Sequence, residues 1–230
     1  MKGDQMKTIT KAVAAKVVKT VSAGLCSGVG KPEPGQMCVE AAVCYALGLP
    51  HGDNPQCVSP AIRSLKIALN DSPWSSNKAR ADGLMRLSVL QLGTDKDFDE
   101  EEFVRRVVDI AIGNVVPRAM RYAASIHDAP KHKEALEQAA VRCEKERNEG
   151  AARAAWAAGE AAWAAGEAAR AARAARAARA AWAARAAGEA ARAAWAAGDK
   201  ELKTFATEIE NILIDMKVPG VEWLDLTDKV

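Results

Sequence analysis

The side chains most able to do chemistry are concentrated in residues 35–60. This stretch, GQMCVEAAVCYALGLPHGDNPQCVSP, brings together thiols, an imidazole and carboxylates: Cys38, Glu40, Cys44, His51, Asp53 and Cys57. Residues 37–47 are apolar nearly all round, which predicts a central, buried helix, and Cys38 lies in its first turn. The helix dipole and the free N–H groups at such a position stabilise a thiolate.

These residues support more than one interpretation. Cys38 is a candidate nucleophile, with His51 as its base and Asp53 as the orienting acid. The same three side chains with Glu40 are candidates for binding a small ligand. The spacings match no standard zinc pattern, and Cys38 and Cys44 point to different sides of the helix, so we predict no metal and no cofactor. Alternatively, the cysteines are small buried hydrophobes and Asp53 caps a loop.

Parts of this segment resemble a known sequence family. MCVEAAV, LGLPHGDNPQCVSP and the LND at 69–71 are similar to a segment of uncharacterised bacterial and phage-type proteins, some of which carry an Ala-rich low-complexity helix after it. The resemblance covers residues 24–72. It implies a shared helical module of phage or bacterial accessory type and no particular activity. In those relatives the glutamate often lies one position later than Glu40, and His51 is not always matched, which weakens a catalytic role for His51.

A second unusual stretch, residues 151–198, consists almost entirely of Ala doublets separated by Arg, Trp or Gly-Glu. Ala is the strongest helix former and Pro is absent, so the stretch predicts one long helix of roughly 70 Å. It contains no Ser, Thr, Cys or His and therefore offers no catalytic group. We expect it to build a surface.

On a helical wheel the larger residues of this stretch gather on one half, and the other half is bare Ala except where Arg176 and Arg179 intrude. Bare Ala lets another helix approach closely. We therefore predict a non-enzymatic interaction or assembly protein that forms a homo-oligomer or binds a protein partner through this helix. The candidate interaction residues are Trp156, Trp163, Ala165, Arg176, Arg179, Trp182 and Trp195.

Two other interpretations of the Ala-rich stretch stay open. It could be a solvated helical spacer without a partner. It could also bind nucleic acid, because seven Arg outnumber three Glu and Trp accompanies them. Arg at spacings of three spirals around a helix, however, and does not line a groove.

The rest of the chain predicts an all-α protein in three parts. These are a compact helical body at 1–147, the Ala-rich helix at 148–199, and a C-terminal part at 200–230 that starts with an amphipathic return helix. In the body, one helix should end at Gly113-Asn114 and Pro117 should open the next. A polar helix starting near Pro130 should run directly into the Ala-rich helix.

Composition bears on the partners and the cellular compartment that we expect for the protein. The 230 residues carry a net charge of only +2, which excludes no class of partner. Five irregularly spaced cysteines indicate reduced thiols in a cytoplasmic protein. Lys16 and Lys19 interrupt the N-terminal apolar run, and Leu25 stands where a lipoprotein signal needs a small residue, so we expect neither a signal nor a membrane span.

Overall fold

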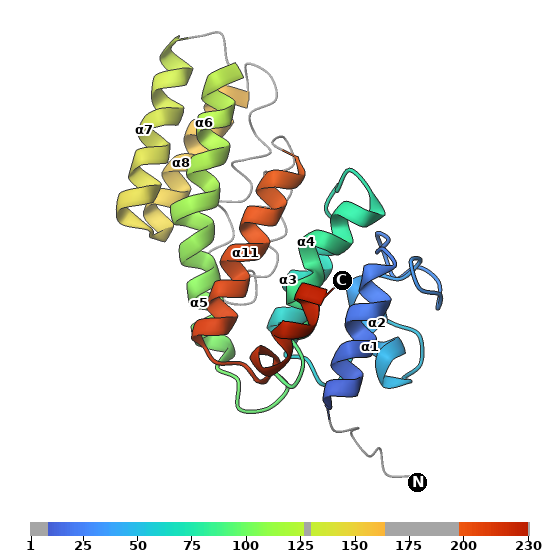
Figure 1. Cartoon of the computed structure of the whole chain (residues 1–230). Helices are drawn as coiled ribbons and strands as arrows, with labels where there is room; N and C mark the ends of the chain where they lie inside the picture. The colour runs from blue at the N-terminus through green and yellow to red at the C-terminus, as the bar shows by residue number, and fades with distance from the viewer. Residues whose placement is uncertain (1–8, 127–129, 164–197, 230) are drawn as a thin grey trace. The chain divides into compact units, whose positions relative to one another are not determined.

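The computed structural model describes residues 9–126, 130–163 and 198–229, and this part of the chain is all-α, as predicted (Figure 1). It contains no strand in the described ranges, only an isolated bridge between Gly30 and Met37. The helices are α1 (Lys11–Ser22), α2 (Val39–Leu47), α3 (Pro60–Asn70), α4 (Asn77–Leu90), α5 (Glu100–Ile110), the π-helix η1 (Ala111–Val115), α6 (Val116–Ile126), α7 (Pro130–Glu146), α8 (Glu149–Trp163), α11 (Asp199–Asp215) and the 3-10 helix η5 (Pro219–Lys229).

The chain divides into two compact units. The first takes in the chain up to Glu100 and from Ala206 onward, and the second takes in Glu101–Phe205. The sequence-based division places its boundaries instead at 147/148 and 199/200. The difference arises because η1, α6, α7 and α8 pack on one another, whereas a division by composition assigns them partly to the body and partly to the Ala-rich stretch.

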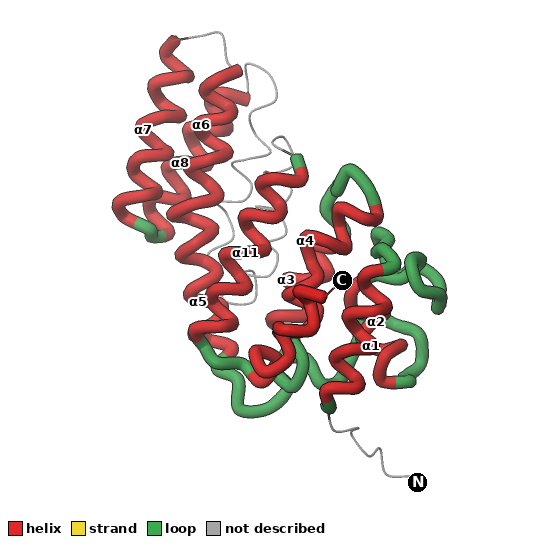
Figure 2. Tube along the Cα trace, in the orientation of Figure 1, coloured by secondary structure: helices red, strands yellow, loops and turns green. Residues whose placement is uncertain are grey.

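The first unit packs α1, α2, α3 and α4 together, with η5 against α1 and α4. Pro60 occupies the first turn of α3, as the Ser59-Pro60 pair predicts, and Ser76, one of two serines expected to start α4, accepts a hydrogen bond from the first turn of that helix. The cap of α1 is Thr10, which accepts from the Val13 N–H, whereas the sequence pattern pointed to Thr8. Nearly all of α2 is buried, as its apolar sequence predicts. Long loops join α1 to α2 and α2 to α3 (Figure 2).

The second unit contains a continuous helical run from α5 through η1 to α6. The predicted break between Gly113-Asn114 and Pro117 is therefore wrong. Pro117 has no N–H to donate, and the chain accommodates it by widening the preceding turn into a π-helix, in which the Val116 N–H bonds to the Ala111 carbonyl.

Helix α7 does not continue into the Ala-rich stretch, which corrects a second prediction. It ends at Glu146, and α8 begins after two intervening residues, at Glu149. Helices α6, α7 and α8 lie side by side (Figure 1). The α7–α8 corner is held by contacts of Arg147 with residues far away in the sequence, which local helix propensity does not register.

The C-terminal amphipathic helix is present as α11, and the tail after it folds onto the first unit. Trp223 is buried, and Gly220 lies so close to the backbone of Val89 and Leu90 that a side chain there would collide with both carbonyls. The tail is thus part of the core of its unit.

Candidate functional site

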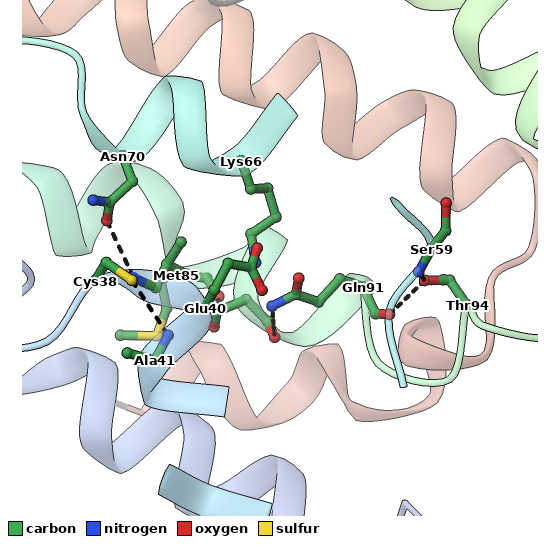
Figure 3. Close-up of polar contacts among 11 residues, drawn as sticks. Cys38, Glu40, Ala41, Ser59, Lys66, Asn70, Met85, Gln91 and Thr94 are labelled. Carbon is green, nitrogen blue, oxygen red and sulfur yellow. Dashed lines mark hydrogen bonds and ion pairs between the residues drawn. The ribbon is translucent and has the colours of Figure 1, made fainter. Parts of the chain in front are cut away.

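The N-terminus of α2 uses Cys38 as its cap. The Cys38 Sγ accepts a hydrogen bond from the Ala41 N–H at 3.3 Å, and the neighbouring Val39 N–H bonds to Asn70 Oδ1 at 3.1 Å (Figure 3). Asn70 Nδ2 in turn donates to the Cys26 carbonyl at 2.9 Å. The LND stretch therefore ties the end of α3 to the start of α2 and to the loop before it.

Of the three cysteines of this segment, Cys38 and Cys44 are buried and Cys57 is half-buried. Burial raises the pKa of Cys38 to about 11, that of Cys44 to about 12 and that of Cys57 to about 11. The sequence suggested the opposite direction for Cys38, because the helix N-terminus favours a thiolate. Desolvation outweighs that effect in the folded protein, since only 4% of Cys38 is exposed. All five cysteines of the chain are free.

His51 and Asp53 lie differently with respect to Cys38. The His51 ring is exposed, and its Nε2 lies 3.0 Å from the Gly30 carbonyl oxygen. Asp53 is near enough for its charge to contribute, as a smaller cause, to the raised pKa of Cys38. The structure thus brings Asp53, Glu40 and Cys38 into one electrostatic neighbourhood, while the His51 ring is engaged with the loop before α2.

Glu40 forms a buried ion pair with Lys66 of α3 that the sequence analysis missed. Lys66 Nζ lies 3.2 Å from Glu40 Oε1, and both side chains are 0% exposed (Figure 3). The signal was available in the sequence, because Lys66 follows Ile62 by four positions and so falls on the buried face of α3. A lysine on that face needs a buried partner, and the only acidic residue of α2 is Glu40.

Both members of the pair are shifted toward their neutral forms. Desolvation raises the pKa of Glu40 and lowers the pKa of Lys66, and their mutual attraction opposes both shifts. Apart from this 3.2 Å ion pair, Glu40 Oε1 and Oε2 and Lys66 Nζ have no hydrogen-bond partner among the described residues. The same is true of the nearby Gln91 Oε1. Gln91 donates its own amide N–H to the Ser88 carbonyl.

A hollow on the surface of the first unit lies away from this cluster. Its charged residues neutralise one another, because Lys78 pairs with Asp82 and Arg86 pairs with Asp228 and Glu210. The hollow is lined by Ser22, Lys78, Asp82, Met85, Arg86, Thr227 and Asp228. A ligand of either charge would have to break these pairs to bind.

The Ala-rich stretch enters the described structure through α8. Ala151, Ala152 and Ala155 are 0% exposed, and Trp156 is half-buried beside them. Trp163 is the last residue of α8. The other predicted interaction residues lie outside the described residues: Ala165, Arg176, Arg179, Trp182 and Trp195.

Comparisons with known proteins do not assign the chain to a family. No family model, curated protein or solved structure matches it. The resemblance of residues 24–72 to bacterial and phage-type proteins stays a prediction. Within the described ranges, no group of three or more His, Cys, Asp or Glu side chains is placed to hold a metal ion, and no helix is long and apolar enough to cross a membrane.

Proposed function

We propose that this protein is a non-enzymatic assembly protein that self-associates through its Ala-rich helix. The observation that supports this most strongly is the complete burial of Ala151, Ala152 and Ala155 against neighbouring helices. At least at its start, the Ala-rich stretch is a packing element and not a solvated spacer. The same composition continues for more than thirty residues beyond α8, which is enough for a second helix contact.

The packed stripe of α8 differs from the one expected from the wheel. Ala158 lies on the half of the helical wheel that is bare Ala, which was expected to pack, yet it is only half-buried. Gly159, in contrast, is buried with the three alanines. The stripe therefore lies closer to the Trp side, where Trp156 borders it. A close helix contact flanked by a large aromatic residue combines a short interhelical distance with added buried area.

The cluster around α2 supports a structural role for the segment at 35–60. Its thiols are protonated at neutral pH, and the Glu40–Lys66 pair is closed to solvent. A cysteine nucleophile needs a thiolate with access to its substrate. The five free thiols are compatible with a reducing compartment, and we propose a cytoplasmic location on that basis.

Thiol labelling tests the non-enzymatic part of the proposal. In native protein at neutral pH, iodoacetamide should modify Cys38 as slowly as the buried Cys44, and the half-buried Cys26 should react before either. Peptide mapping by mass spectrometry reads out each site. Selective fast modification of Cys38 would restore the nucleophile as the better interpretation.

The assembly part is tested with Ala165→Leu. If Ala165 lies in a close helix contact, the added side chain overpacks it, and we expect a loss of about 1–3 kcal/mol in stability or a lower association constant. Ala157→Leu is the matched control, because Ala157 is exposed on α8 and Leu is also a good helix former. Unchanged melting temperature and unchanged sedimentation of Ala165→Leu would contradict the proposal.

A further inference from the structure

The corner between α7 and α8 is unusually tight for its sequence. Only Arg147 and Asn148 separate the two helices, and Arg147 adopts φ +45°, in the left-handed region. Glycine or asparagine normally occupies such a position, because a side chain with a Cβ is strained there. Asn148 caps α8, with its Oδ1 accepting from the Ala151 N–H at 2.8 Å.

The Arg147 guanidinium holds this corner closed. Its Nη1 lies 2.8 Å from Asp109 Oδ2, and its Nη2 lies 2.9 Å from Asn114 Oδ1. The guanidinium sits directly over Gly113, where any Cβ would collide with it. Gly113 and Asn114 belong to the π-helix η1, so the widened turn also provides part of the surface that Arg147 contacts. We call the contacts of Arg147 with Asp109, Gly113 and Asn114 the Arg147 clasp.

The same sequence has a second favourable conformation. Residues 130–163 contain no proline after Pro130, and the residues at the corner, EKERNEGAA, are mostly strong helix formers. Local propensity alone predicts an uninterrupted helix here. Opening the corner would relieve the left-handed strain at Arg147, break the clasp and join α7 to α8 in one helix. In the closed corner, the backbone strain at Arg147 is therefore offset by the contacts of its side chain with Asp109, Gly113 and Asn114.

We propose that this corner is a hinge, and that two copies of the chain exchange α8 when it opens. The inference rests on the proposed self-association and adds its partner and mechanism. The surface uncovered on one chain already fits α8, since it buries Ala151, Ala152 and Ala155 and places Cys143 Sγ 3.4 Å from the Ala151 carbonyl. The α8 of a second copy remakes every one of these contacts, while the hinge loses its strain.

A disulfide distinguishes exchange from closure within one chain. Cys143 Sγ lies 3.4 Å from the Ala151 carbonyl oxygen, so Ala151→Cys places a second thiol on the residue that Cys143 contacts in both arrangements. After mild oxidation and non-reducing electrophoresis, exchange gives a covalent dimer, and closure gives a monomer. Cys143→Ser with Ala151→Cys removes the intended link and reports any cross-linking through the other cysteines.

Two variants shift the balance in opposite directions. Arg147→Ala removes the clasp and favours a continuous helix, so it should strengthen dimerisation on the order of tenfold. Arg153→Ala is its control, because it removes an Arg of α8 whose ion pair, with Glu149, lies within that helix. Inserting Gly-Ser-Gly between Arg147 and Asn148 relaxes the corner and should weaken dimerisation. Circular dichroism confirms that each variant is folded.

The outcomes separate this inference from the proposed function. Interchain links, together with a dimer strengthened by Arg147→Ala, support the exchange. A dimer in sedimentation whose link forms within each chain overturns the exchange and leaves self-association standing. Monomers for both wild type and Arg147→Ala overturn the exchange and also contradict self-association.

Discussion

The cluster around α2 and the stripe on α8 bury their residues by different means. At α2, an ion pair, the thiols of Cys38 and Cys44 and the Gln91 amide are enclosed among large apolar side chains. At α8, the buried residues are alanines and a glycine. The first region depends on charge compensation and is therefore sensitive to pH and to loss of a partner. The second depends on small size and is sensitive to added volume.

The largest effect that separates the two regions is expected at Lys66. Lys66→Met leaves Glu40 buried without its counter-charge and should cost about 3–5 kcal/mol in the free energy of unfolding, measured by urea denaturation. The double variant Glu40→Leu with Lys66→Met removes both charges and should recover most of that loss. A single variant within about 1 kcal/mol of wild type would show that the pair is not buried as described.

The corresponding change on α8 adds volume and leaves charge untouched. Ala155→Leu inserts a larger side chain into the closed helix contact and should cost about 1–3 kcal/mol. Ala157→Leu, on the exposed side, should stay within about 0.5 kcal/mol of wild type. Thermal melts of the two variants side by side measure the difference, and equal melting temperatures would count against the packed stripe.

Alkaline pH should destabilise the α2 region. The thiols of Cys38, Cys44 and Cys57 ionise near 9.0 when unfolded and at about 11 or 12 when folded, so the unfolded chain loses protons first. Their contribution is complete below pH 9 and is lost as pH rises toward 11, at about 1.4 kcal/mol per pH unit for each thiol. Urea midpoints at pH 8, 9 and 10 measure the loss.

A variant isolates the thiols in that experiment. The lowered pKa of Lys66 acts in the opposite direction as pH approaches 10.5, so total slopes mix the two effects. Cys44→Ala removes one thiol and should flatten the fall in stability between pH 9 and 10. If the stability of wild type and of Cys44→Ala fell with the same slope, burial would not raise the pKa of Cys44 in the folded protein.

The smallest effect is expected for an exposed ion pair on α8. Arg153 lies 2.5 Å from Glu149, but its side chain is 71% exposed. Water screens such a pair, so Arg153→Ala should cost no more than about 0.5 kcal/mol, measured by the same melts. A loss above about 1.5 kcal/mol would mean that Arg153 has a role beyond this pair.

The sequence predicts the helices of this protein better than the contacts between them. The start of α4 at Ser76 follows from a local cap hydrogen bond and that of α3 from the fixed backbone of Pro60, both of which short sequence patterns record. The cap of α1 lies two residues later than the Thr8 that the pattern indicated. The α7–α8 corner does not, because Arg147 finds its partners 38 and 33 positions earlier in the chain. The continuous α5–η1–α6 run was not predicted for a related reason. A π-turn accommodates Pro117, where the sequence pattern led us to expect the end of one helix and the start of another.

In the candidate site, too, local features were predictable from the sequence and long-range contacts were not. The sequence located the segment with Cys38 and Glu40, and it raised plain packing of the cysteines as an alternative. It could not weigh burial against the helix dipole at Cys38, because burial depends on α3 and α4 packing around α2. Lys66 was missed, although its place on the apolar face of α3 was visible.

Native mass spectrometry of the purified 230-residue chain, across a range of concentrations, tests the central claim of self-association most directly. The expected result is a dimer or higher oligomer that grows with concentration and carries no retained small ligand. Under the same conditions, Ala165→Leu should shift the population toward monomer, and Ala157→Leu should match wild type. A wild-type protein that stays monomeric at every concentration would contradict the account.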